Sequence, residues 1–167
     1  KNMEQRLKKY ASTDLLTEVL NRRAGLDYLQ EEMKLVSENG ERLSVIFIDI
    51  NNLKLVNDNF GHNEGDKLLQ TVSNILQHSL RHNDKVVRLG GDEFLLILPQ
   101  SDKDSAEKIW KRITKKLKKA TKLNDKDYKN KLEKYYNTHQ LPWWEVFVMG
   151  PNGELVGYTH EIIDTIE

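Results

Sequence analysis

The sequence predicts an α/β domain of the α+β sandwich kind, in which helices flank a central mixed β-sheet. Residues 43–50 are almost all apolar and rich in β-branched side chains, a pattern typical of a central strand buried on both faces. Apolar residues recur at intervals of three and four over residues 21–38 and 64–79, which predicts two helices. Two short apolar runs, 86–87 and 94–98, enclose a glycine pair and indicate a β-hairpin. Strands that alternate with helices around such a hairpin favour helices packed on one mixed sheet.

Further elements are expected on both sides of this central region. Residues 1–12 have the spacing of the end of an incoming helix, and Asp14 is expected to cap or interrupt that helix before the next one begins. Residues 13–167 are expected to form the domain itself, with a C-terminal part that is atypical or truncated. The Glu38-Asn39-Gly40 sequence is a helix stop. The later expected elements are a helix over 102–120, a short helix around Leu132, strands at 144–149 and 155–157 joined by a turn at 151–153, and the start of a last helix at 161–166.

The charge balance limits what the chain can bind without a dedicated site. Lys and Arg number 26, as do Asp and Glu, so the formal net charge of the 167 residues is zero. A neutral chain has no general attraction to nucleic acid or to an anionic membrane, and we expect a local site to hold any phosphate. No apolar run approaches the roughly 20 residues that cross a bilayer, so no membrane segment is expected within the chain.

The residue usage also bears on the compartment. The chain has no cysteine, which excludes disulfide bonds and thiolate metal sites. This fits a reducing compartment, and we expect a cytoplasmic protein or the cytoplasmic part of a larger, membrane-anchored one. The first residue is Lys1 rather than Met, which favours a piece of a longer protein with a sensory domain upstream.

Three carboxylates are expected to meet at one end of the sheet. Asp49 follows the buried strand, and Asp92 and Glu93 lie at the tip of the predicted hairpin. Carboxylates that converge from two loops make an oxygen site suited to Mg²⁺ or Mn²⁺. Gly90 and Gly91 would let a phosphate approach the backbone closely. The alternative is that Asp49 caps a turn and that the glycine pair only closes a hairpin.

A polar segment between these elements has the chemistry to read a purine base. Asn and Asp side chains can hydrogen-bond a base edge, and a carboxylate can accept from two adjacent N–H groups of guanine. Lys54 could reach a phosphate as a point charge. The alternatives are an Asx-turn followed by an N-capped helix, and a solvated surface lysine. The polar residues crowd around a predicted turn and helix start and are Asn57, Asp58, Gly61, His62, Gly65 and Asp66.

Taken together, these motifs resemble the GGDEF diguanylate cyclase domain. The similarity covers about residues 12–120, and four separate motifs occur in the family's order. It implies a nucleotidyl-cyclase or palm-like fold with the motif Gly90-Gly91-Asp92-Glu93-Phe94 on a hairpin. The remaining matching segments are Asp14, Leu16-Thr17, Asn21-Arg22-Arg23, Asp49-Ile50-Asn51-Asn52-Leu53-Lys54, Asn57-Asp58, Gly61-His62, Gly65-Asp66 and Arg88-Leu89.

The resemblance implies a metal-dependent reaction of GTP. Asp49 and Asp92 would ligate the metal through their side chains and Ile50 through its carbonyl, with Glu93 beside the metal and Lys54 neutralising phosphate charge. The 3′-hydroxyl of one GTP would attack the α-phosphorus of another, so two domains must face each other as a homodimer to make cyclic di-GMP.

The resemblance also assigns the substrate pocket. Asn57 and Asp66 would hold guanine, His62 would help shape the pocket, and Gly90 and Gly91 would let GTP lie close to the hairpin.

A second implied site is regulatory. Arg81 and Asp84 resemble the family's RxxD inhibitory site, which binds the product, and five residues separate the end of this motif from the glycine pair. Arg81 could fork onto a phosphate or a guanine edge, and Asp84 could accept from guanine. Arg88 would assist from the same face. The alternative is an arginine at a helix end beside an Asp turn.

Two departures from the family pattern keep other functions open. Asn51 and Leu53 replace a usual Asp and Phe, and the family's C-terminal Lys and Arg that reach the phosphates are absent. A cyclic di-GMP receptor without catalysis, a dimerisation module, and a cyclase for another purine are therefore the alternatives. A phosphodiesterase is disfavoured because the chain lacks the Glu-rich second domain for it.

Overall fold

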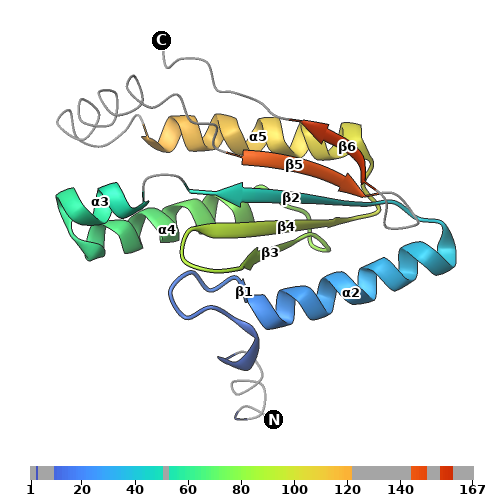
Figure 1. The fold of residues 1–167 in the computed structure, drawn as a ribbon, viewed down its shortest axis with the longest axis horizontal. Helices are drawn as coiled ribbons and strands as arrows, with labels where there is room; N and C mark the ends of the chain where they lie inside the picture. The colour runs from blue at the N-terminus through green and yellow to red at the C-terminus, as the bar shows by residue number, and fades with distance from the viewer. Residues whose placement is uncertain (1–2, 4–9, 51–52, 122–143, 150–154, 160–167) are drawn as a thin grey trace.

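The computed structural model describes residues 3, 10–50, 53–121, 144–149 and 155–159. They form a six-stranded mixed sheet in the order β1-β3-β4-β2-β5-β6, in which only the β1–β3 pair is parallel (Figure 1). The predicted α+β sandwich is confirmed. The strands are β1 (Leu20–Asn21), β2 (Leu43–Asp49), β3 (Lys85–Arg88), β4 (Glu93–Pro99), β5 (Trp144–Met149) and β6 (Leu155–Thr159).

Helices cover both faces of this sheet. Helix α2 (Arg22–Asn39) lies on one face, and α4 (His62–Gln77) and α5 (Lys103–Thr121) lie on the other (Figure 1). A short helix, α3 (Leu53–Phe60), follows β2 and packs on α4. The predicted helices over 21–38, 64–79 and 102–120 are therefore present, each within two residues of its expected bounds.

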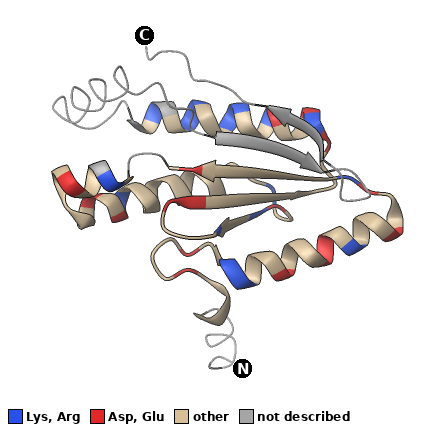
Figure 2. Cartoon of the chain, viewed as in Figure 1, with Lys and Arg blue, Asp and Glu red and all other residues tan. Residues whose placement is uncertain are grey.

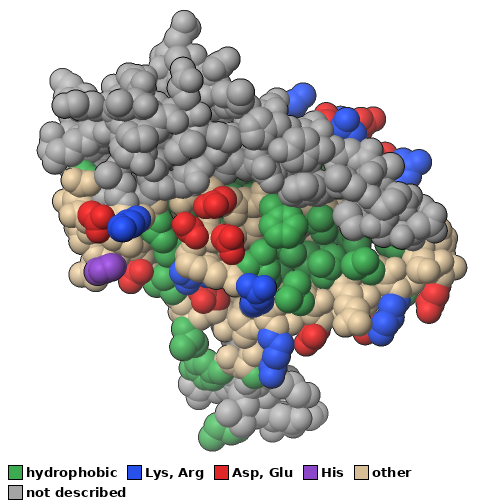
Figure 3. Space-filling model, in the orientation of Figure 1, with side chains coloured by type: hydrophobic (Ala, Val, Ile, Leu, Met, Phe, Trp, Pro, Cys, Tyr) green, Lys and Arg blue, Asp and Glu red, His purple; other side chains and the backbone are tan. Residues whose placement is uncertain are grey.

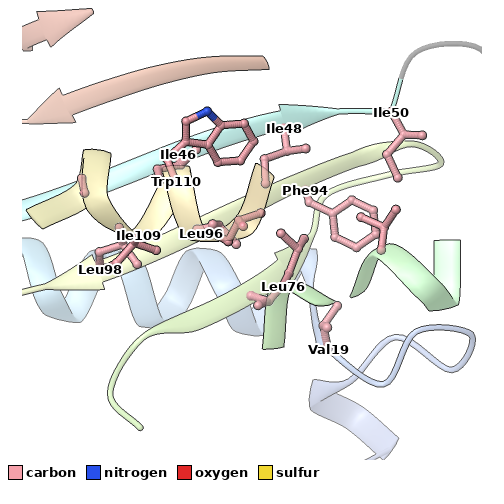
Figure 4. Close-up of a cluster of buried hydrophobic side chains, with 14 of the residues drawn as sticks. Val19, Ile46, Ile48, Ile50, Leu76, Phe94, Leu96, Leu98, Ile109 and Trp110 are labelled. Atoms are coloured by element: carbon pink, nitrogen blue, oxygen red, sulfur yellow. The ribbon is translucent and has the colours of Figure 1, made fainter. Parts of the chain in front are cut away.

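Strand alternation divides the buried side chains between two cores. Ile46, Ile48 and Ile50 of β2 and the segment after it join Phe94, Leu96 and the α4–α5 side chains in the larger core (Figure 4). Leu43 and Val45 point to the opposite face and pack with the α2 side. Burying an aliphatic side chain contributes about 1.5–3 kcal/mol, so the two faces of β2 together hold the sheet between its helices.

The ends of α2 follow from local chemistry. The Asn21 side chain accepts a hydrogen bond from the Ala24 N–H at 3.0 Å and caps the helix start. Gly40 ends the helix in the left-handed conformation, with φ of 66°, and donates to the Val36 carbonyl at 2.9 Å. The predicted helix stop at this glycine is confirmed.

Two elements were not predicted. Asn57 and the polar residues after it were expected around a turn and the start of a helix, but Asn57 lies within a helix, α3 (Leu53–Phe60), and Gly61, whose φ is 89°, separates it from α4. Strand β1 was missed because it has only two residues and pairs with β3 across a long stretch of sequence.

Several expectations fall at the edges of the described chain. Met3 and Tyr10–Ser12 are helical, as expected for the end of an incoming helix, and the division of the chain at residue 12 stays a prediction. The short helix around Leu132, the turn at 151–153 and the last helix at 161–166 lie outside the described residues. Within the described chain, no helix combines the length and the apolar character needed to span a bilayer.

Candidate functional site

Three acidic residues lie near one another where β2 ends and β4 begins. Asp49 is the last residue of β2 and Glu93 the first of β4, and the two are direct cross-strand partners. The Ile50 N–H donates to the Asp92 carbonyl at 2.9 Å, which ties the end of β2 to the hairpin. We call Asp49, Asp92 and Glu93 the carboxylate edge. Figure 2 marks acidic positions in red at this end of β2 and on the β3–β4 hairpin, and Figure 3 shows acidic side chains gathered on this part of the surface.

The carboxylate edge concentrates negative charge. Burial raises the pKa of Asp49, and the negative charges of Asp92 and Glu93 raise it further. No ion pair among the described residues involves any of the three. Nor do three acidic or histidine side chains anywhere in the described ranges converge closely enough to form a complete metal site. This donor set fits a cation such as Mg²⁺, which binds through one or two protein carboxylates and takes its other ligands from water and phosphate.

The glycine pair beside these carboxylates is not required by the fold. The hairpin closes through hydrogen bonds from the Leu89 N–H to the Glu93 carbonyl (2.9 Å) and from the Glu93 N–H to the Gly90 carbonyl (3.3 Å). Neither Gly90 nor Gly91 has a positive φ. A Cβ at Gly91 would meet nothing within 4 Å, and one at Gly90 would lie 3.6 Å from Glu93 Oε2. Both positions would therefore accept a side chain, so the missing side chains leave open space outside the hairpin.

Arg88 fastens this hairpin to the N-terminal turn. Its guanidinium donates to Asp14 Oδ1 at 3.0 Å and to the Gly91 carbonyl at 2.8 Å, and only 14% of its side chain is exposed. Burial alone would raise the pKa of Asp14, but hydrogen bonds from Thr17 and Arg88 outweigh it and lower that pKa. Asp14 thus organises the turn that follows the N-terminal helical residues, and it holds Arg88.

The predicted base-reading residues lie at the corner between α3 and α4. Asn57 is half-buried in α3, whereas His62 and Asp66 are exposed in the first turns of α4. The Gly61 N–H donates to the Asn57 carbonyl at 2.8 Å and closes the corner. Lys54 is exposed at the second residue of α3, the helix that follows Asp49. The structure therefore places these four residues on the two helices that follow β2.

The predicted inhibitory residues are only partly brought together. Asp84 is buried and accepts from both the backbone N–H (2.9 Å) and the Nε (3.2 Å) of Arg81. The Arg81 side chain is 54% exposed and also donates to Ser101 Oγ at 3.1 Å. Tyr28 of α2 donates to the Asn83 carbonyl at 2.8 Å and fixes the same turn. Arg88 is the last residue of β3 and pairs with Asp14, and its role at the Arg81 surface stays a prediction.

Sequence reasoning missed two features of this region. Leu53, Val56 and Phe60 recur at helical spacing and could have revealed α3. Asp14 and Arg88 lie 74 positions apart in the sequence. An Asp and an Arg at such a separation give no pattern from which their contact could be predicted.

Comparisons with known proteins agree with the resemblance to the GGDEF family seen in the sequence. A family model described as diguanylate cyclase, GGDEF domain, matches residues 11–136. Diguanylate cyclase DosC of Escherichia coli is 37% identical over 116 residues, which cover 67% of this chain and 25% of that protein. The signaling protein YkoW of Bacillus subtilis is 34% identical over 124 residues, 73% of this chain and 16% of that protein. The chain thus spans about a quarter or less of the length of these relatives.

Solved structures of similar fold include two with bound molecules. Diguanylate cyclase SiaD of Pseudomonas aeruginosa, in complex with its activator SiaC, aligns with a TM-score of 0.62 at 34% identity, over 67% of this chain and 43% of SiaD. The coiled coil and GGDEF domain of DgcB from Caulobacter crescentus, in complex with c-di-GMP, aligns with a TM-score of 0.65 at 26% identity, over 67% of this chain and 59% of that one.

Proposed function

The chain belongs to the GGDEF family of diguanylate cyclase domains, and we propose that it condenses two GTP molecules into cyclic di-GMP. One observation carries this proposal. The carboxylate edge, uncompensated by any ion pair in the described chain, lies beside a glycine pair that the fold itself does not require. A divalent cation would neutralise the carboxylates, and the polyphosphate that it accompanies would occupy the open space beside the glycine pair.

The chain's own residues would hold the metal and the phosphates. Asp49 and Asp92 would ligate Mg²⁺ or Mn²⁺ through carboxylates and Ile50 through its carbonyl, with Glu93 beside them. The bound metal supplies electrostatic stabilisation of charge on the phosphates. Lys54, exposed on α3, would add a positive charge to the same phosphates. Gly90 and Gly91 would let the polyphosphate lie against the hairpin backbone.

The guanine base would be read at the corner between α3 and α4. The Asp66 carboxylate can accept from two adjacent N–H groups of guanine, a pair that adenine lacks. Asn57 would bind the same base, and His62 would shape the pocket. Because Asp66 is exposed in the described structure, its hydrogen-bonding capacity is available to a ligand.

The reaction itself requires two domains. The 3′-oxygen of one GTP forms a bond to the α-phosphorus of the other, the bond from that phosphorus to the β-phosphate oxygen breaks, and pyrophosphate leaves as the hydroxyl proton is released. A second such step closes the ring. Each domain holds one GTP, so two copies must face each other, and holding the reactants in line accounts for much of the acceleration. The predicted N-terminal helix would bring the copies together under an upstream sensory domain.

Product inhibition would act through Arg81. Its guanidinium is more than half exposed and is oriented by Asp84 and Ser101, so it can fork onto a phosphate or a guanine edge. The similar DgcB domain binds c-di-GMP, which supports a product site in this family. Asp84 would serve as the partner that positions Arg81, because its own side chain is 1% exposed.

Paired substitutions test the proposed active site. Asp49→Ala and Asp92→Ala should each lower turnover of GTP by more than about 100-fold, the loss typical when a key electrostatic group is removed. Thermal melting should show that both variants stay folded. Glu31→Ala, on the exposed face of α2, is the matched control and should keep full activity. Unchanged turnover in a folded Asp49 or Asp92 variant would refute the proposed site.

A further inference from the structure

Two glycines are buried inside helices, and they face different kinds of neighbour. A Cβ at Gly25 of α2 would lie 2.2 Å from Val87 Cγ1, in the core between α2 and the sheet. A Cβ at Gly65 of α4 would instead lie 1.9 Å from Asn57 Oδ1 and 2.9 Å from Asn57 Cγ. Glycine is unfavourable within a helix, so each position needs a reason for it. At Gly65 the nearest neighbour is the Asn57 amide, and Leu53 Cδ1 follows at 3.3 Å.

The backbone fixes this contact at the corner between α3 and α4. The Gly61 N–H donates to the Asn57 carbonyl at 2.8 Å, and the Gly65 N–H approaches the Gly61 carbonyl at 3.4 Å. Gly61 itself has φ of 89°, a conformation that side chains disfavour. Asn57 and Gly65 are therefore held against each other through a short, closed connection.

The Asn57 amide is seated by shape rather than by hydrogen bonds. Its Oδ1 is buried and has no hydrogen-bond partner among the described residues. A buried polar atom without a partner is rare in a folded protein and requires an explanation. Here the space left by the missing Gly65 side chain accommodates Asn57 Oδ1 and Cγ.

We propose that Gly65 is a positioning residue for base recognition, because its missing side chain creates the seat that orients the Asn57 amide toward guanine. This inference rests on the proposed function, in which Asn57 binds the base. An added methyl group would displace Asn57 rather than the backbone, since the atoms that it meets first belong to that side chain. Substitution at Gly65 therefore affects recognition more than folding.

A comparison of two glycine variants separates these effects. We expect Gly65→Ala to weaken binding of a GTP analogue with a non-cleavable α–β bridge by about tenfold, the cost of roughly one hydrogen bond. It should also reduce the preference for that analogue over its ATP counterpart, and its Tm should stay close to that of the wild type. Gly25→Ala is the matched control: it should lower Tm, because Val87 is fully buried, while analogue affinity is kept.

A double-mutant cycle with Asn57→Ala decides whether Gly65 acts through Asn57. In the Asn57→Ala background, Gly65→Ala should not weaken binding further, because the amide that it displaces is already gone. Equal weakening in both backgrounds would overturn the inference, as would unchanged affinity of Gly65→Ala in the wild-type background. If Asn57→Ala alone leaves binding unchanged, the role of Asn57 in the proposed function fails, and this inference fails with it. A loss of Tm in Gly65→Ala matching that of Gly25→Ala would indicate a purely structural glycine.

Discussion

Asp49 must meet two opposing requirements. Its side chain lies beside Asp92 and Glu93, and burial together with their charges raises its pKa above the ordinary value of 3.8. An ionised Asp49 therefore destabilises the metal-free fold, although the same charge would attract a cation. Sites built for ligands commonly carry such a cost.

This cost predicts the effect of Asp49→Asn on stability. In metal-free buffer at neutral pH the variant should melt at a higher temperature than the wild type, since it removes the repulsion and keeps the size of the side chain. A raised native pKa makes wild-type stability fall as pH rises from 3.8 through that raised value. The advantage of Asn should therefore vanish in acid. Melting curves from pH 3 to pH 8 measure it, and a variant less stable at neutral pH would contradict this electrostatic account.

A side chain at position 91 should affect substrate binding but not the stability of the fold. A Cβ at this position meets nothing within 4 Å, so Gly91→Ala should keep the Tm of the wild type or raise it slightly. If GTP phosphates approach this backbone, the same methyl group should raise the KM for GTP about tenfold or more. Steady-state kinetics with thermal melting test this, and an unaltered KM would show that the phosphates lie elsewhere.

At the scale of elements, the N-terminal turn and the GGDEF-motif hairpin behave as one unit. Arg88 donates to Asp14 and to the Gly91 carbonyl, and Asn21 donates to the Ala11 carbonyl at the end of the incoming helix. The hairpin that carries Asp92 is thus fastened to the N-terminal segment of the described chain.

The Asp14–Arg88 pair predicts a pH-dependent contribution to stability. Because the native pKa of Asp14 is lowered, its contribution is fully present above the ordinary value of 3.8 and is lost as pH falls through the native value. Asp14→Asn should lower Tm at neutral pH by about 2–4 °C, as expected for a loss of about 1 kcal/mol in a domain of this size. The two melting curves should converge below pH 3, and a gap that persists there would exclude the ion pair as its cause.

The turn before β3 predicts the effect on product inhibition. Arg81→Ala should raise the concentration of cyclic di-GMP needed for half inhibition by about tenfold or more, since hydrogen bonds from a charged group are lost. Asp84 keeps its bond to the backbone N–H of residue 81, so the turn should survive. Arg42→Ala, an exposed arginine that pairs with Asp102, is the matched control. An unchanged inhibition curve for Arg81→Ala would count against the site.

The elements that periodicity defines were predicted well. The alternation in β2 and the three-to-four spacing in α2, α4 and α5 arise from burial on defined faces, which the sequence records directly. Helix α3 was not predicted because its Asn and Asp residues favour turns locally, and packing against α4 overrides that preference. Long-range contacts such as β1 with β3 leave no periodic signal.

The whole molecule combines a rigid sheet with one charged end. The two cores hold β2 and β4 in register from Leu43 and Pro99 to Asp49 and Glu93, so the convergence of the carboxylates follows from strand pairing. The motif spacing predicted this meeting. It did not predict that Arg88 pairs with Asp14 and the Gly91 carbonyl, because the sequence carries no local signal for such a long-range contact.

Direct detection of product tests the central claim. The purified chain should be incubated with GTP and Mg²⁺, and cyclic di-GMP and pyrophosphate should be quantified by chromatography. We expect both products, at a rate per protein that rises with protein concentration because two domains must meet. Folded protein that binds GTP but forms no cyclic di-GMP at any concentration, with or without added Mn²⁺, would contradict the assignment of this chain as a cyclase.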